Sequence, residues 1–407
     1  MPRLPYRTLF SILAVLAAVA LGLVSVQVAA ADAPTYKDVP ATHWAYAAIE
    51  SVTLCGPEGH KVLDDYGDLF KPEEPITREL LARSLVLASG NYGENLKPVS
   101  INDVGEGERY YDVIQVALKH GYMQLDDSGD FRPQEPVPAY QAEAAMVRWL
   151  EEKYPSADWS LLKTLRPAVW QPNDGWTTEA PVYLPYVIAS RQLELRYNHP
   201  SDGDAHEVTP TQPIDRAEVA YMFSRAYALG SDWQLYGLAG YKNITFPALS
   251  DRQKQIVRFA LKYVGYPYIW AGEYPTKQSP YGAQDAGGFD CSGFVFYVMK
   301  MHFEYPITVN ERGAHDMAER AKPRITRKEL QCGDLIFFAP NGPKSKVESI
   351  YHAGLYLGNG WFIHSTGSTD GVTLNSLDTS SYYKKYFAWG RRVLTPEELL
   401  PPPPAGP

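Results

Sequence analysis

Cysteine is scarce in this chain, with three among 407 residues, at positions 55, 291 and 332. Three cysteines cannot build the disulfide framework of a small secreted domain, so the cores must be held by apolar packing. Long apolar runs are absent beyond the first thirty residues, so no later segment is predicted to cross a membrane. The chain also lacks the mixture of basic and aromatic residues typical of nucleic-acid binders, and no nucleic-acid partner is expected.

The first 31 residues have the features of an export signal. Arg3 and Arg7 precede an apolar stretch that ends near Val28, and Ala29-Ala30-Ala31 supplies the small residues of a cleavage site. We expect residues 1–31 to be removed and the mature protein to lie outside the plasma membrane, without a membrane contact. The alternative is an uncleaved anchor, because about 20 apolar residues can span a bilayer.

Charge is divided unevenly along the chain. Residues 32–244 carry 18 Lys and Arg against 32 Asp and Glu, whereas residues 245–395 carry 18 against 13. This change from a net charge of −14 to +5 predicts a domain boundary near residue 245. The length also exceeds that of one ordinary core. The basic part favours an anionic environment such as a cell wall.

The acidic part contains three related blocks. Each block is predicted to hold an amphipathic helix, an acidic loop with glycine, a short extended segment and a second helix. The second helix follows Ile76-Thr77-Arg78-Glu79, Tyr140-Gln141-Ala142-Glu143 and Ile214-Asp215-Arg216-Ala217-Glu218. We assign the repeats to residues 34–95, 96–155 and 156–228, with a linker at residues 229–248.

These blocks resemble S-layer homology repeats, which occur in threes and hold exported proteins on a secondary cell-wall polysaccharide. In that family, the arginine at the start of the second helix grips the anionic sugar. The resemblance therefore implies that Arg78 and Arg216 bind wall polymer, whereas Gln141 replaces the arginine in the second block. The alternative is a helical repeat that only packs against the other domain or against a partner.

One cysteine lies at a predicted helix start. Phe289-Asp290-Cys291-Ser292-Gly293 precedes an apolar run long enough for a buried helix, and Asp290 is a good N-cap residue. The free N–H groups and the dipole at a helix N-terminus stabilise an anion. We therefore expect the pKa of Cys291 to be lowered toward the range of reactive cysteines.

Two histidines fall on a predicted hairpin. Strands at residues 351–357 and 361–365 are joined by Gly358-Asn359-Gly360. A two-residue loop would place His352 and His364 on opposite faces of the ribbon. A three-residue loop would pair His364 with glycine at position 354, put both histidines on one face and collect apolar residues on the other. We favour the three-residue loop.

The Cys291 segment, the strand at residues 334–338, His352-Ala353-Gly354 and Ile363-His364 together resemble the NlpC-type cell-wall cysteine peptidase family. The resemblance covers about residues 250–393 and implies a papain-like α+β domain, which we assign to residues 249–395. It implies that Cys291 is the nucleophile, that His352 is the base and that His364 orients His352.

The same resemblance implies a substrate site. Asp290 and Ser292 correspond to residues that bind the free amine of an N-terminal L-Ala, and Tyr268 corresponds to a second oxyanion donor beside the backbone N–H of Cys291. The substrate would be the γ-D-glutamyl–diamino-acid bond of peptidoglycan stem peptides. The family's Leu-Pro-Arg-Thr stretch reads Ile307-Thr308-Val309-Asn310 here. No cofactor is expected. Zinc bound by the cysteine and the two histidines is chemically possible. However, a cysteine that follows an aspartate at a helix start suits thiolate activation better than zinc binding.

The predicted architecture is a multidomain one: a helical S-layer-homology-like repeat domain followed by an α+β papain-like peptidase domain. Residues 396–407 form a Pro-rich tail. The predicted function is hydrolysis of peptidoglycan peptides at a bacterial cell surface. An amidase or acyl transferase on the same fold is one alternative, and a wall-binding protein with an inactive catalytic half is another.

Overall fold

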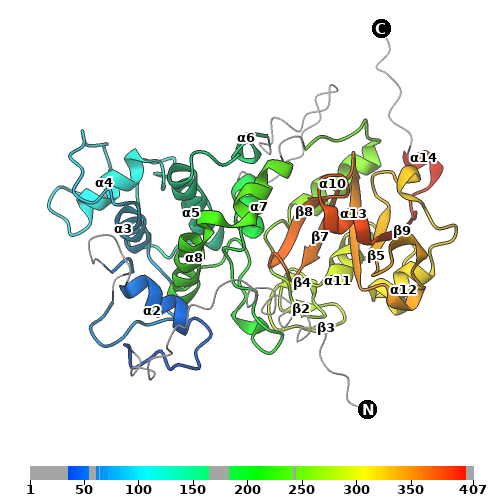
Figure 1. Ribbon diagram of the computed structural model, residues 1–407, viewed down its shortest axis with the longest axis horizontal. Helices are drawn as coiled ribbons and strands as arrows, with labels where there is room; N and C mark the ends of the chain where they lie inside the picture. Colours follow the sequence, from blue (N-terminus) through cyan, green and yellow to red (C-terminus); the bar gives the residue numbers. More distant parts are fainter. Residues whose placement is uncertain (1–34, 55–60, 64, 165–182, 242–243, 400–407) are drawn as a thin grey trace, which may run out of the picture.

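The computed structural model describes residues 35–54, 61–63, 65–164, 183–241 and 244–399. The predicted signal peptide and Cys55 lie outside the described residues. Figure 1 shows helices at one end of the molecule and a sheet with helices around it at the other. None of the helices within the described ranges is long and apolar enough to cross a membrane.

The first of these two parts consists mainly of helices that share an apolar core. The core contains the fully buried side chains of Tyr36, Trp149 and Phe223, which come from all three predicted blocks. The helices are α2 (Tyr46–Leu54), α3 (Arg78–Ser89), α4 (Tyr111–Lys119), α5 (Ala139–Lys153), α6 (Leu161–Thr164), α7 (Leu184–Gln192) and α8 (Arg216–Ala228).

Three extended segments, one from each block, bond to one another in a ring. The N–H of Ile76 donates to the carbonyl of Ile214 at 3.0 Å, that of Ile214 to Val137 at 2.9 Å, and that of Val137 to Ile76 at 2.9 Å. All three side chains are fully buried. Because α3, α5 and α8 begin directly after these segments, the ring places their first turns around one centre.

The second part is built on a five-stranded antiparallel sheet in the order β8-β7-β6-β5-β9. Its strands are β5 (Leu335–Phe338), β6 (His352–Gly358), β7 (Trp361–Thr366), β8 (Gly371–Ser376) and β9 (Phe387–Arg391). Four two-residue strands precede them: β1 (Glu273–Tyr274), β2 (Gln278–Ser279), β3 (Gly282–Ala283) and β4 (Gly288–Phe289). The helices are α10 (Asp251–Leu261), α11 (Cys291–Phe296), α12 (Ala314–Glu319), α13 (Ser381–Tyr386) and α14 (Pro396–Leu399). Helix α11 packs against β6 and β7 and continues as a π-helix over Tyr297–His302.

The hairpin of β6 and β7 has the register that places both histidines on one face, but it reaches this register by another turn. Leu355 pairs with Ile363, and after a bulge at Leu357, Gly358 pairs with Trp361. The turn itself therefore has two residues. The extra residue in the bulge restores the offset that the predicted three-residue loop would give. The prediction of the register is confirmed, and that of the loop length is wrong.

Both faces of the sheet are covered. The face opposite the histidines carries Leu355 and Ile363 in the main core, as predicted. The histidine face is also apolar, because Phe338, Phe362 and Tyr383 form a second buried cluster on it. Tyr383 comes from α13, which covers this side of the sheet. The histidines therefore lie in an apolar environment that the hairpin pattern did not predict.

A buried arginine joins the two parts. Arg191 of α7 is fully buried and donates to the carboxylate and carbonyl of Asp370 and, at 2.5 Å, to the carbonyl of Gly265. The predicted linker is also packed: α9 (Trp233–Gly237) and a 3-10 helix (Leu238–Tyr241) run through it, and Tyr241 is buried. The two parts are thus in direct contact.

Candidate active site

Cys291 is the first residue of α11, as predicted. The carboxylate of Asp290 caps the helix by accepting the N–H of Gly293 at 2.6 Å. Cys291 is 8% exposed, and the backbone N–H groups of Ala353 and Ser292 favour its thiolate. Ala353 follows His352 in β6, so the cysteine lies beside the strand that carries the predicted base.

The pKa of the cysteine is opposite to the prediction. Burial, together with the negative charge of Asp290, raises the pKa of the Cys291 thiol to about 12. The N–H groups of Ala353 and Ser292 and the charge of Arg312 act in the other direction but do not offset the burial. The predicted lowered pKa is therefore wrong: the helix end is present, but the sulfur has lost its water.

The two histidines form a close pair. His352 Nε2 lies 2.6 Å from His364 Nδ1, and the ring planes are nearly perpendicular. Gly354 makes room for this contact, since a Cβ there would come within 3.3 Å of the Cβ of His364. Burial lowers the pKa of His352 to about 4, and burial with the neighbouring ring lowers that of His364 well below its usual value. Both imidazoles are neutral at neutral pH.

Two residues behind the histidine pair were not predicted. Asn375 of β8 places its Nδ2 3.0 Å from His364 Nε2, and the hydroxyl of Tyr241 donates to Asn375 Oδ1 at 2.9 Å. His364, Asn375 and Tyr241 are all buried. The sequence held no signal for them, because Tyr241 lies in the presumed linker and Asn375 belongs to no motif.

An arginine organises the helix tip. Arg312 donates to both carboxylate oxygens of Asp290, at 3.1 and 3.2 Å, and to Ser292 Oγ at 2.9 Å. Its Nε donates to Glu273 at 2.8 Å. Asp290 and Ser292 are thus bonded to a cation of the protein itself, and amine binding by them stays a prediction. The motif did not predict Arg312, because the family's arginine aligns with position 309; a cation three residues further on was the available signal.

Three predicted residues remain, namely Tyr268 and the two arginines of the repeats. Tyr268 is half-buried in the segment before β1, and its substrate role stays a prediction. Arg216 is 1% exposed and donates to the carbonyl of Phe70 at 2.9 Å, so it is closed to a polymer in this arrangement. Arg78 donates in the same way to the carbonyl of Phe131, at 2.6 Å, but it lines an open cavity of about 890 Å³.

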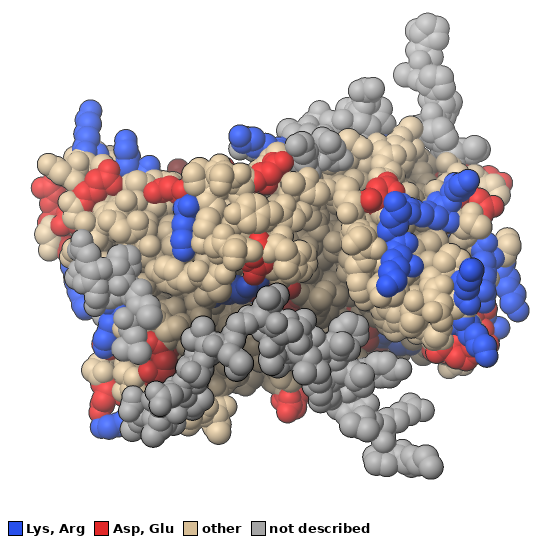
Figure 2. Space-filling view, in the orientation of Figure 1, with Lys and Arg blue, Asp and Glu red and all other residues tan. Residues whose placement is uncertain are grey.

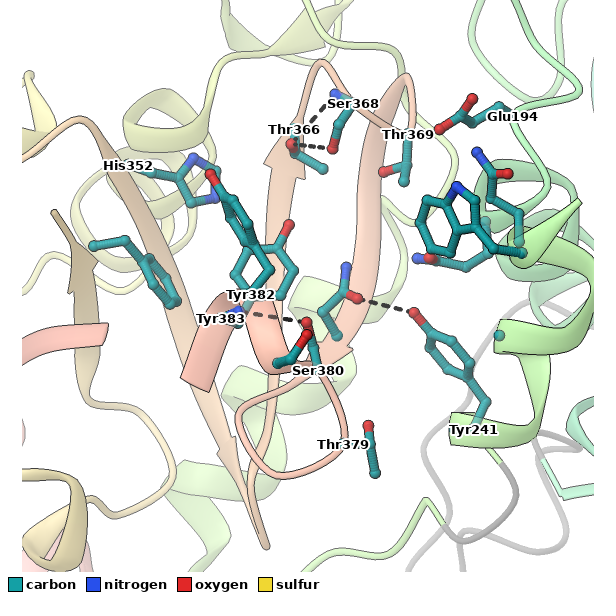
Figure 3. Close-up of a pocket in the computed structure, with 18 of the residues that line it drawn as sticks. Glu194, Tyr241, His352, Thr366, Ser368, Thr369, Thr379, Ser380, Tyr382 and Tyr383 are labelled. Atoms are coloured by element: carbon teal, nitrogen blue, oxygen red, sulfur yellow. Dashed lines mark hydrogen bonds between the residues drawn. The ribbon is translucent and has the colours of Figure 1, made fainter. Parts of the chain in front are cut away.

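A cavity of about 700 Å³ opens beside His352. Figure 3 shows His352, Tyr382 and Tyr383 on one side of this cavity and Glu194 and Tyr241 on the other. Both parts of the molecule therefore supply its walls. Within the described ranges, no group of three or more His, Cys, Asp or Glu side chains is arranged to hold a metal ion.

Comparisons with known proteins match both parts. The model of the NlpC/P60 family matches residues 265–391, and that of the S-layer homology domain matches residues 100–137. Murein DD-endopeptidase MepH of Escherichia coli is 33% identical over 39% of this chain and 55% of its own length. A Bacillus cereus γ-D-glutamyl-L-lysine dipeptidyl-peptidase is 27% identical over 52% of this chain and 58% of its own.

A solved NlpC/P60 family protein from Bacillus cereus is 31% identical, with a TM-score of 0.28 over 38% of this chain and 42% of that one. The part of the chain that matches MepH or the dipeptidyl-peptidase spans little more than half the length of each of those two relatives. It is a multidomain protein with a papain-like NlpC/P60 domain in its C-terminal region and an S-layer homology domain in its N-terminal region.

Proposed function

We propose that the protein is an exported cell-wall cysteine endopeptidase that cuts peptidoglycan stem peptides. The observation that carries this proposal is the His352–His364 pair, at 2.6 Å, on the two strands β6 and β7 that pack against a helix begun by a cysteine. This is the layout of a thiol nucleophile with a base and an orienting group. Matches to the NlpC/P60 family and to named peptidoglycan endopeptidases support it.

The chemistry starts from neutral groups. Because the pKa of Cys291 is raised to about 12 and that of His352 is lowered to about 4, a preformed ion pair is disfavoured in the free enzyme. His352 instead takes the thiol proton as the sulfur attacks the peptide carbonyl. It returns the proton to the departing amine, and water then releases the acyl group from the thioester. Positioned acid–base catalysis of this kind contributes about 10²–10⁴-fold.

The substrate side can be assigned from the same chemistry. His352 must protonate the leaving amine, so the diamino-acid half of the substrate lies in the cavity that His352 lines. Glu194 is the one Asp, Glu, Lys or Arg side chain among the described residues lining it. Its carboxylate is 3.7 Å from Arg225, which makes a closer pair, at 2.8 Å, with Asp232. A carboxylate that shares its cation with a closer acidic partner suits the side-chain ammonium of a diamino acid.

We infer that residues 34–228 form three S-layer-homology-like repeats that hold the enzyme at the cell surface. The ring of bonds among three equivalent segments supports the threefold division. The cavity beside Arg78 is also lined by Tyr140, Tyr183 and Arg148, which suit a sugar, although Asp126, Asp130 and Glu135 line it too. Figure 2 shows Lys and Arg side chains over the catalytic end, in keeping with an anionic wall.

Digestion of defined muropeptides followed by mass spectrometry tests the proposal. We expect the purified mature chain to release products cut between D-glutamate and the diamino acid. Products cut at the bond between the sugar and L-alanine would instead establish an amidase. An unchanged digest under conditions where the protein is folded would establish an inactive catalytic half.

A further inference from the structure

A buried chain of hydrogen bonds runs from the histidine pair to the segment between the two parts of the molecule. It passes from His352 Nε2 to His364 Nδ1 at 2.6 Å, from His364 Nε2 to Asn375 Nδ2 at 3.0 Å, and from Asn375 Oδ1 to the hydroxyl of Tyr241 at 2.9 Å. Figure 3 draws the last of these as the dashed line from Tyr241.

The direction of this chain decides which nitrogen of His352 carries the proton. An amide nitrogen only donates, so His364 Nε2 accepts from Asn375 and a neutral His364 carries its proton on Nδ1. That proton is donated to His352 Nε2, and the proton of a neutral His352 then lies on Nδ1. His364 occupies Nε2 of His352, so only Nδ1 could accept the thiol proton. With the hydrogen bonds in this direction, Nδ1 already carries a hydrogen and has no free lone pair.

Turning the amide of Asn375 by half a turn reverses every bond. Its oxygen then accepts from His364 Nε2, His364 Nδ1 accepts from His352 Nε2, and His352 Nδ1 presents a lone pair. Each imidazole still carries one proton. The hydroxyl of Tyr241 changes from donor to acceptor, which a phenol allows. Only this direction accommodates a protonated His352, because its Nε2–H then meets an acceptor rather than another N–H.

We propose that Asn375 and Tyr241 are positioning residues, an amide–hydroxyl pair that sets the tautomer of His364 and thereby decides whether His352 can accept the thiol proton. The proposal rests on the proposed function of His352 as the base. An amide and a phenol are both donor and acceptor, so the pair satisfies the histidines in either direction. A carboxylate or an apolar side chain in place of Asn375 would not.

Tyr241 also connects the base to the N-terminal part. It ends the 3-10 helix at Leu238–Tyr241 and is buried, and its ring lies 5.6 Å from that of Trp361 in β7. The segment that precedes the catalytic half therefore supplies one member of the chain. The position of this segment on the sheet, and not only the sheet itself, sets the orientation of the base.

The test compares substitutions that remove or keep the acceptor in the full-length mature protein. Asn375→Leu removes both polar atoms, and we expect kcat to fall about 10–100-fold, as for other outer partners of a site, with KM little changed. Asn375→Asp offers only acceptor atoms. It therefore holds the arrangement in which residue 375 accepts from His364 Nε2 and His352 Nδ1 is free to take the thiol proton. We expect it to retain kcat within a few-fold, and the acid limb of its pH profile to move to higher pH because a carboxylate favours the imidazolium.

Tyr241→Phe keeps the ring packing and should lower kcat by less than Asn375→Leu does. Tyr236→Phe is the matched control, because Tyr236 lies in the same segment and is 54% exposed. We expect it to leave kcat unchanged. A wild-type kcat in Asn375→Leu, or an equal loss in Asn375→Leu and Asn375→Asp, would overturn the proposal.

A second measurement does not depend on activity or on the folding of the leucine variant. ¹⁵N NMR of histidine-labelled protein reports which ring nitrogen is protonated. We expect the proton of His364 to move from Nδ1 to Nε2 between the wild type and Asn375→Asp. The same tautomer in both would overturn the proposal. A wild type that cuts no peptide but shows this change would refute the proposed function alone.

Discussion

The acid side of the pH–rate profile follows from the burial of the base. His352 must be neutral to take the thiol proton, and burial lowers its pKa to about 4. At pH 5 a group with a pKa of 4 is about 90% neutral, whereas one with the ordinary imidazole pKa is only about 3% neutral. The structure therefore predicts that kcat/KM at pH 5 stays close to its value at pH 7. An ordinary histidine, about 76% neutral at pH 7, would give about a 25-fold fall.

The assay is kcat/KM for a defined muropeptide between pH 3.5 and 8, which reports the ionisations of the free enzyme. Acid also affects the fold. The pKa of His352 is lowered in the folded state, so the stability that its neutral form contributes is present above the ordinary pKa and is lost as the pH falls toward 4. A sample held at pH 5 and assayed at pH 7 must therefore regain full activity. An acid limb centred near pH 6.5, with reversible activity, would refute the reasoning.

Three further changes test other parts of the account. Because the pKa of Cys291 is raised to about 12, its alkylation by iodoacetamide should speed up about tenfold per pH unit from pH 7 to 9; a rate that is already constant there would contradict this. Arg191→Met should lower the free energy of unfolding in urea by about 3–5 kcal/mol, because Asp370 stays buried without its cation. Adding Asp370→Asn should recover part of this lost stability. A loss below about 1 kcal/mol in Arg191→Met alone would contradict a stabilising role for the Arg191–Asp370 pair between the two parts. Glu194→Gln should raise KM for lysine-containing peptides about two- to fivefold and leave KM for Nε-acetylated peptides unchanged; an equal rise for both would exclude recognition of the ammonium.

Local patterns were enough to predict the helix start at Cys291 and the shared face of the two histidines on the hairpin. An aspartate before an apolar run placed Cys291 at a helix start, and alternating side chains with a Gly-Asn-Gly turn set the register of the two histidines. Both follow from short-range geometry, namely N-capping and the two-residue period of a strand. The bulge that corrects the turn was not predictable, because it depends on how β6 packs.

What depends on tertiary packing was missed. The pKa of Cys291 is set by the loss of water around the sulfur, which no local pattern reports. Tyr241 lies 134 residues before Asn375, and only the packing of the linker on the sheet brings them together. Arg312 lies three residues beyond the position where the family motif places its arginine, and its role became evident only from its contacts with Asp290 and Glu273.

The central claim is that the sulfur of Cys291 forms the bond to the substrate. Its most direct test is muropeptide hydrolysis by Cys291→Ala beside Cys332→Ala, since Cys332 is a second buried free thiol of this domain. The account predicts that Cys291→Ala yields no product while Cys332→Ala keeps the wild-type rate. Hydrolysis by a folded Cys291→Ala variant at the wild-type rate would contradict it.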